Sequence, residues 1–178
     1  MYFKSLTITN FKSFEGEQKI SFSKGINYIV GDNNCGKSTI IDALRYLADG
    51  ARDTSALQNK AASEDFSVEG VIAGSDLVQI VADKKYSKYK DYLLTDGDEP
   101  YFRVRRSPKE EEIEQNGKKV KLDGKKAPFW NPNTQKFENP SGIDALFKSL
   151  VDLVPVLADN TTSEIVDFGS TKTLGKLI

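Results

Sequence analysis

The stretch that decides the fold of this chain is Gly31-Asp32-Asn33-Asn34-Cys35-Gly36-Lys37-Ser38. It matches the phosphate-loop pattern G-x-x-x-x-G-K-S/T at every fixed position. The β-branched and aromatic run at 26–30 predicts a strand before the loop, and helically spaced apolar residues predict a helix over 37–48. A glycine-bounded loop at a helix N-terminus presents backbone N–H groups and the positive helix end to a polyphosphate. The sequence therefore predicts a nucleotide site.

Each residue type in this loop has a physical role. Gly31 and Gly36 let the backbone approach a phosphate closely, because they adopt conformations that a side chain forbids. Lys37 is placed to reach the β- and γ-phosphates, Ser38 offers a hydroxyl ligand to Mg²⁺, and Thr39 can donate to the α-phosphate. The remaining loop residues that we predict to bind the nucleotide are Asn33, Asn34 and Cys35. Cys35 is either a small residue that fits the loop or a reactive thiol whose alkylation blocks nucleotide binding.

Composition excludes several classes of site and partner. With 178 residues the chain has the length of a single domain, and its net charge of -1 predicts no strong overall attraction to nucleic acid or membrane. The absence of histidine excludes histidine-based triads and the usual histidine metal sites. A single cysteine rules out an internal disulfide and suits a reducing cytoplasm, and no apolar run has the length of a membrane span.

The first half of the chain is clearly patterned. Period-two alternation predicts a hairpin of strands, a helix follows the loop up to a glycine cap at Gly50, and a polar loop with a short helical piece leads to a further strand. The corresponding ranges are 2–9, 18–22, 37–48, 51–65 and 66–73.

The second half is less regular. A helix capped by Asp76 is predicted first, then strands that form a second hairpin within 98–123, a long irregular connection and a final helix. The corresponding ranges are 77–93, 101–105, 118–122, 124–142 and 143–153. Residues 170–178 read as the opening turns of another helix, so we expect residues 1–178 to be the N-terminal portion of a longer protein.

The run from Leu6 to Phe14, followed by the loop, resembles the head domain of the ABC-type ATPases of DNA maintenance: SMC-like proteins, RecF and the overcoming-lysogenization-defect (OLD) nucleases. The doubled Asn33-Asn34 and the stretches 64–66, 154–159 and 170–177 are most similar to the OLD group. The resemblance implies a mixed α/β P-loop NTPase fold: an incomplete ABC ATPase-like head with a mixed sheet around the loop and an antiparallel β subdomain.

The same resemblance implies ATP as the nucleotide, bound between two heads, and therefore a homodimer or a head-to-head partner. In OLD proteins a C-terminal Toprim nuclease domain follows, which implies DNA repair or phage defence. The turn after the first strand lies over the nucleotide in this family, so Lys12 and Ser13 are assigned to phosphate or base contact. The alternative is that Lys12 is a solvated turn lysine.

The sequence contains no complete Walker B or signature motif, the two motifs that ATP hydrolysis requires in this family. Asp159 ends an apolar run as a Walker B aspartate would, but Asn160 stands where glutamate belongs and Pro155 interrupts the strand. Ser141-Gly142 matches only half of a signature motif. We therefore assign no catalytic residue and expect this chain alone to bind ATP without efficient hydrolysis. We expect the true Walker B motif beyond residue 178, where the missing motifs would complete an ATPase.

Basic segments offer a DNA surface. Residues 84–92 interleave lysines with tyrosines that could stack on bases, and a second basic stretch consists of Arg103, Arg105, Arg106, Lys118, Lys119, Lys121, Lys125 and Lys126. The stronger alternative places the tyrosines in the core with the lysines on the wet face. DNA contact through an attached effector domain is also open.

Three functions compete at this point. The first is an ATP-binding head that couples nucleotide binding to DNA processing or nuclease activity. The second is a kinase-like enzyme or a GTPase, although 59–62 lacks the aspartate of a guanine-reading motif. The third is a non-catalytic P-loop interaction module that dimerises with or regulates a partner.

Overall fold

The computed structural model describes residues 1–51, 53–108, 111–115, 118–122 and 126–154. The predictions for Lys125, Pro155, Asp159, Asn160 and 170–178 lie outside these residues. The main strands are β1 (Tyr2–Thr9), β2 (Glu17–Ser21), β3 (Ser67–Ala73), β4 (Leu94–Asp96), β5 (Glu99–Arg106), β8 (Phe129–Asn131) and β9 (Lys136–Glu138). The helices are α1 (Lys37–Asp49), α2 (Asp76–Ala82) and α3 (Ile143–Leu150), with short 3-10 helices η1 (Ser55–Leu57) and η2 (Ser87–Tyr92).

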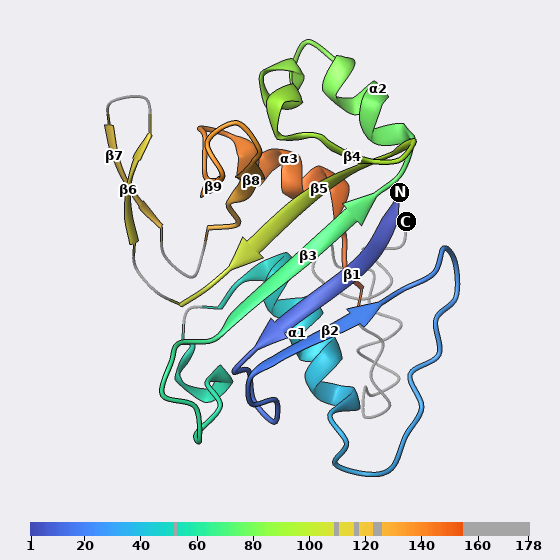
Figure 1. Cartoon of the computed structure of the whole chain (residues 1–178), viewed down its shortest axis with the longest axis vertical. Coiled ribbons are helices and arrows are strands. Elements are labelled where there is room, and N and C mark those ends of the chain that lie inside the picture. Colours follow the sequence, from blue (N-terminus) through green and yellow to red (C-terminus); the bar gives the residue numbers. More distant parts are fainter. Residues whose placement is uncertain (52, 109–110, 116–117, 123–125, 155–178) are drawn as a thin grey trace, which may run out of the picture.

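The strands form one 7-stranded sheet in the order β2-β1-β3-β5-β8-β9, with β4 paired to β5. Every neighbouring pair of described strands is antiparallel. A separate hairpin of β6 (Glu111–Gln115) and β7 (Lys118–Leu122) projects away from the sheet (Figure 1). The predicted mixed α/β class with an antiparallel sheet is confirmed, whereas no described strand joins a mixed sheet around the loop.

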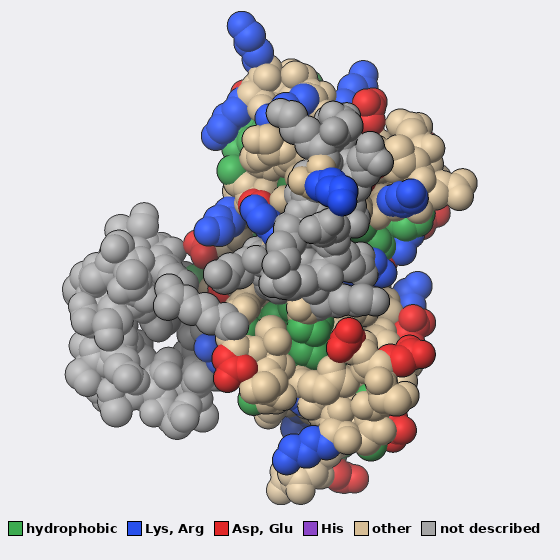
Figure 2. All heavy atoms as spheres, turned by 90° about the vertical axis from the view of Figure 1, so that its left-hand side faces the viewer, with side chains coloured by type: hydrophobic (Ala, Val, Ile, Leu, Met, Phe, Trp, Pro, Cys, Tyr) green, Lys and Arg blue, Asp and Glu red, His purple; other side chains and the backbone are tan. Residues whose placement is uncertain are grey.

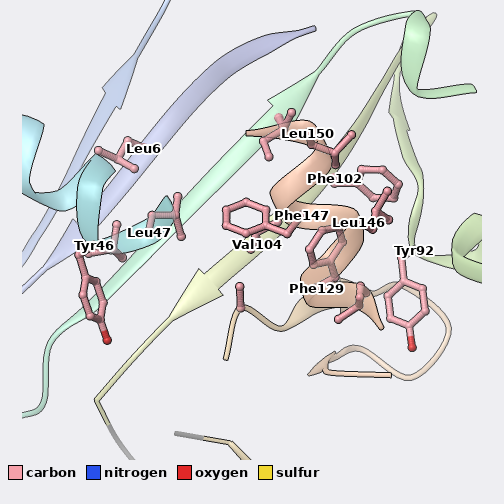
Figure 3. Close-up of a cluster of buried hydrophobic side chains, with 14 of the residues drawn as sticks. Leu6, Tyr46, Leu47, Tyr92, Phe102, Val104, Phe129, Leu146, Phe147 and Leu150 are labelled. Carbon is pink, nitrogen blue, oxygen red and sulfur yellow. The ribbon is translucent and has the colours of Figure 1, made fainter. Parts of the chain in front are cut away.

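The core lies on one face of the sheet, which α1 and α3 both cover (Figure 3). Alternate residues of the central strands point to this face, among them Leu6, Val68 and Val104, which are fully buried. Gly70 of β3 lies directly under α1, because a Cβ at this position would come within 2.5 Å of Leu47 Cδ2. Glycine here allows α1, and with it the loop, to sit close to the sheet.

Helix α1 buries one stripe that includes Thr39, Ala43 and Leu47. It ends at the predicted cap, where the Gly50 N–H donates to Tyr46 O over 2.8 Å. The buried guanidinium of Arg106 donates to the Leu47 and Ala48 carbonyls at 2.7 and 3.2 Å. A cation at this end also complements the helix dipole.

The predicted strand at 26–30 is wrong. Residues 26–30 have no regular structure, and Ile26, Tyr28 and Val30 are 77%, 84% and 86% exposed. A strand requires a paired neighbour for its backbone N–H and C=O groups. No strand within the described part of the chain pairs with this segment, so its favourable residue types do not suffice.

Three predictions in the second half also need correction. The helix over 77–93 is interrupted at Asp83, whose backbone is extended and whose carboxylate accepts from the Lys85 N–H at 2.7 Å. Asp76 lies in the first turn of α2 and binds the Met1 ammonium at 2.8 Å, so it does not cap the helix. The connection over 124–142 contains the hairpin β8–β9, whose three-residue strands are too short to show a period in sequence.

Candidate nucleotide site

The predicted phosphate loop leads directly into α1. Gly36 precedes the helix with φ +95° and ψ 9°, a left-handed conformation that glycine adopts without strain. Asn34 has φ +64°, which asparagine tolerates better than most residues. The Ile40 N–H donates to Gly36 O at 3.1 Å and closes the first helical turn. The preceding N–H groups are therefore available to an anion at the positive end of the helix.

Lys37 is folded back over this loop. Its ammonium donates to the carbonyl oxygens of Gly31 at 2.8 Å and Asp32 at 2.6 Å, and lies 3.8 Å from Cys35 Sγ. These contacts hold the cation above the loop, where phosphate oxygens would replace neutral carbonyls with charged acceptors. Cys35 is exposed, and both sequence interpretations of its role remain predictions.

A hollow of about 710 Å³ opens at this end of α1, within the usual range for small-molecule sites. The structure brings most predicted binding residues to it: the lining residues are Ser13, Asn33, Asn34, Gly36, Lys37, Ser38 and Thr39. The Ser38 hydroxyl is exposed there, and Ser13 Oγ lies 2.7 Å from Thr39 Oγ1. The turn at residues 10–16 and the loop thus share one pocket.

Lys12 lies at the edge of this pocket without lining it. Its ammonium pairs with the carboxylate of Asp42 on α1. Both side chains are about one-third exposed, at 33% and 30%. No sequence pattern singles out Asp42, because only the fold brings Lys12 against this face of α1.

The turn at residues 10–16 also packs on the loop itself. A Cβ at Gly36 would lie 2.5 Å from Phe14 Cε1, so the Phe14 ring covers this glycine. The Phe14 N–H donates to Phe11 O at 2.9 Å, and Asn10 and Lys12 both have positive φ. The tight turn therefore depends on support from elsewhere in the chain.

That support comes from residues 57–64. Asn59 is 9% exposed, and its side-chain amide donates to Lys12 O at 2.8 Å while its oxygen accepts from the Ala61 and Ala62 N–H groups. The Lys12 N–H donates to Leu57 O, also at 2.8 Å. In the sequence, Asn59 stands out only as part of 59–62, which lacks the aspartate of a guanine-reading motif. The fold gives Asn59 a bracing role instead.

Most of the named residues in the candidate nucleic-acid segments pack in the core or pair with carboxylates. Tyr89 and Tyr92 are buried, as the alternative interpretation expects, while Lys84 and its neighbours are exposed. Arg106 is only 4% exposed, so its predicted contact with DNA is wrong. Arg103 pairs with Glu69 at 2.8 Å.

The remaining basic stretch includes β7, which pairs with an acidic strand. Lys119 and Lys121 are the register partners of Glu114 and Glu112 across β6–β7. Figure 2 shows Lys and Arg side chains standing singly over one face, without merging into a patch.

The half-signature at Ser141-Gly142 has a packing role. The Tyr89 hydroxyl and the Lys88 ammonium both donate to Ser141 O, at 2.7 and 2.8 Å. Gly142 has φ +85° and begins α3, where a Cβ would lie 2.8 Å from the Tyr89 oxygen. These contacts explain the two residues without reference to a nucleotide.

A carboxylate in the β8–β9 hairpin is also strongly bonded. Glu138 accepts from Tyr92, Asn131 and Thr134 at 2.7, 2.9 and 2.6 Å. Burial alone would raise the pKa of Glu138, but these hydrogen bonds outweigh it and lower the pKa below the ordinary value. Burial and the same carboxylate raise the pKa of Tyr92. Glu138 therefore links the β8–β9 hairpin to Tyr92 of η2 by a hydrogen bond.

The described residues contain neither a metal-binding cluster nor a membrane-spanning helix. No cluster of three or more acidic, cysteine or histidine side chains there could hold a metal. None of the helices that the structure describes has the length and apolarity to cross a bilayer.

Comparison with known proteins places this geometry in context. A family model described as an AAA domain matches residues 5–157. A DNA replication and repair protein RecF from Azobacteroides pseudotrichonymphae genomovar. CFP2 is 52% identical over 48 residues, covering 27% of this chain and 13% of that protein. A chromosome partition protein Smc from Myxococcus xanthus (strain DK1622) is 47% identical over 47 residues, covering 26% of this chain and 4% of that protein. The match thus spans a small part of these relatives.

Solved structures of SMC and RecF proteins are also similar to this chain, with TM-scores below 0.5. A structure from work on ATP-driven dimerization and DNA stimulated activation of SMC ATPases has a TM-score of 0.47 at 20% identity, covering 84% of this chain and 77% of that one. A RecF-ATP structure from the RecFOR pathway has a TM-score of 0.44 at 25% identity, covering 69% of this chain and 28% of that one.

Proposed function

This chain belongs to the AAA domain family, and we propose that it is the ATP-binding head of an SMC- or RecF-like ATPase. The observation that carries the proposal is the pocket at the N-terminus of α1, a helix of 13 residues. Gly36, Lys37, Ser38 and Thr39 line this hollow, so a helix N-terminus, a lysine and two hydroxyl side chains lie around it, as a triphosphate requires.

In the proposed complex the loop surrounds the β- and γ-phosphates. Lys37 leaves the Gly31 and Asp32 carbonyls for phosphate oxygens, since a charge-assisted contact is the stronger one. The Ser38 hydroxyl is the protein ligand for Mg²⁺ arriving with the nucleotide, while Thr39 and Ser13 meet the α-phosphate side of the pocket. A metal held in this way neutralises phosphate charge.

Titration calorimetry with Mg-ATP tests this proposal. The intact chain should show saturable binding, and Lys37→Ala should abolish it because the cation facing the phosphates is lost. Lys84→Ala is the matched control, since Lys84 is an exposed lysine remote from the loop. Absence of saturable heat with folded wild-type protein would refute the proposal. Stronger binding of GTP than ATP would favour the GTPase class.

The finer part of the proposal concerns coupling. We infer from the resemblance to SMC, RecF and OLD proteins that ATP binding promotes a homodimer or head-to-head pair and that this pairing controls DNA processing or a nuclease. Sedimentation velocity with and without Mg-ATP measures the pairing. A monomer at saturating ATP would contradict this part without affecting ATP binding.

One observation favours a second candidate, the interaction module. Ile26, Tyr28 and Val30 are strongly exposed in the segment that precedes the loop, and clustered exposed apolar side chains often mark a contact surface. Under this alternative the chain would bind a partner equally well in wild-type form and as Lys37→Ala. Loss of pairing in that variant would favour the ATP-driven head.

A further inference from the structure

A second lysine at the nucleotide pocket is engaged by a carboxylate. The side chain of Lys12 pairs with Asp42, a contact between the turn at residues 10–16 and α1. Asp42 lies four residues after Ser38, so it is one helical turn, roughly 6 Å, further from the phosphate end of the helix. The neighbouring Ser13 already lines the pocket. Lys12 is thus next to a residue that lines the pocket, while its own ammonium is directed to Asp42.

The backbone of Lys12 is held by two hydrogen bonds, and its side chain is held by a separate contact. Its N–H donates to Leu57 O and its carbonyl accepts from Asn59, both at 2.8 Å. The Lys12 side chain, in contrast, is about one-third exposed, and its ammonium is held by a part-buried ion pair with Asp42. Such pairs contribute little net stability, because both partners are well solvated when apart. A rotation of the side chain could therefore carry the charge without moving the turn.

We propose that Asp42 competes with the nucleotide phosphates for Lys12, so that ATP binding transfers the Lys12 ammonium from Asp42 to the phosphates. This proposal rests on the proposed function of the pocket. A polyphosphate carries several negative charges and Asp42 carries one, which favours the transfer. The Asp42 carboxylate is left at a partly exposed position, where water can solvate it. Asp42 thereby acts as a positioning residue that reduces affinity for ATP.

The sign of the effect distinguishes this mechanism from simple bracing. If Asp42 competes for Lys12, Asp42→Asn should tighten Mg-ATP binding by about 1.5- to 5-fold, the range that a partly exposed ion pair is worth. If Asp42 instead aligned Lys12 for the nucleotide, the same change would weaken binding. A purely structural contact would alter thermal stability and leave affinity unchanged.

A double-mutant cycle measured by calorimetry completes the test. The variants are Asp42→Asn, Lys12→Gln and the pair together, with Asp49→Asn as control because Asp49 is an exposed carboxylate at the far end of the same helix. We expect the tightening to vanish in the Lys12→Gln background and to be absent in Asp49→Asn. Thermal melts of each variant confirm folding.

Several results would overturn the proposal. Weaker or unchanged binding by Asp42→Asn would do so, as would equal tightening with and without Lys12, since the effect would then be general electrostatics. Wild-type protein that shows no saturable ATP binding would refute the proposed function itself, a separate outcome from the cycle.

Discussion

Replacing Asn59 with aspartate tests whether residues 57–64 hold the nucleotide turn in place. The change keeps the size of the side chain and keeps an oxygen that accepts from the Ala61 and Ala62 N–H groups. It replaces the NH₂ group that donates to Lys12 O at 2.8 Å with an oxygen and adds a negative charge. A carboxylate oxygen would then face a carbonyl oxygen across that distance, and the two repel.

The expected cost follows from the burial of this contact. Asn59 is 9% exposed, so the Lys12 carbonyl loses its donor in a place that water reaches poorly. Leaving a buried acceptor unpaired costs about 1–3 kcal/mol. For a chain of this size we expect the melting temperature to fall by roughly 3–9 °C. ATP affinity should fall by up to about tenfold if 1.4 kcal/mol of lost turn order must be restored on binding.

Thermal unfolding followed by circular dichroism gives the stability change, and calorimetry with Mg-ATP gives the affinity. Asn133→Asp is the matched control, since it adds the same charge at an exposed position in the β8–β9 turn. The bracing role would be refuted if Asn59→Asp matched this control in both melting temperature and affinity. A fall in stability alone would show that the brace supports the fold but not the nucleotide site.

Two further predictions concern the loop and the β8–β9 hairpin. Gly36→Ala should abolish ATP binding and lower the free energy of unfolding by about 1–3 kcal/mol, since φ is +95° and the new Cβ would meet Phe14 at 2.5 Å. Adding Phe14→Ala removes this clash but not the backbone strain, so it should recover stability only in part. Denaturant melts measure both effects, and full recovery would disprove the backbone strain. Glu138→Gln should cost roughly 1–2 kcal/mol at neutral pH. Because folding lowers the pKa of Glu138, this carboxylate contributes to the free energy of unfolding above the ordinary carboxyl pKa, and the contribution disappears as pH falls through the folded pKa. The melting temperatures of wild type and Glu138→Gln should therefore converge at acid pH. A difference that stays constant with pH would contradict this assignment.

An ATP site that carries such a brace would be sensitive to changes far from the loop in sequence. Asn59 contacts Lys12 across 47 residues, and the Lys12–Asp42 pair spans 30. Substitutions in residues 57–64 should therefore alter nucleotide binding although none of them lines the pocket. This sensitivity is the functional consequence of building the turn from positive-φ residues that need outside support.

The sequence alone determined the parts of this protein that local chemistry controls. Gly36, Lys37 and Ser38 identify the phosphate loop, apolar spacing identifies α1, and Gly50 ends it, because each effect acts within a few residues. Only the tertiary structure decided whether residues 26–30 found a strand partner, and that Asp42 and Asn59 are the residues that hold Lys12. Those outcomes depend on pairing and hydrogen bonding between segments distant in the chain, which local residue patterns do not encode.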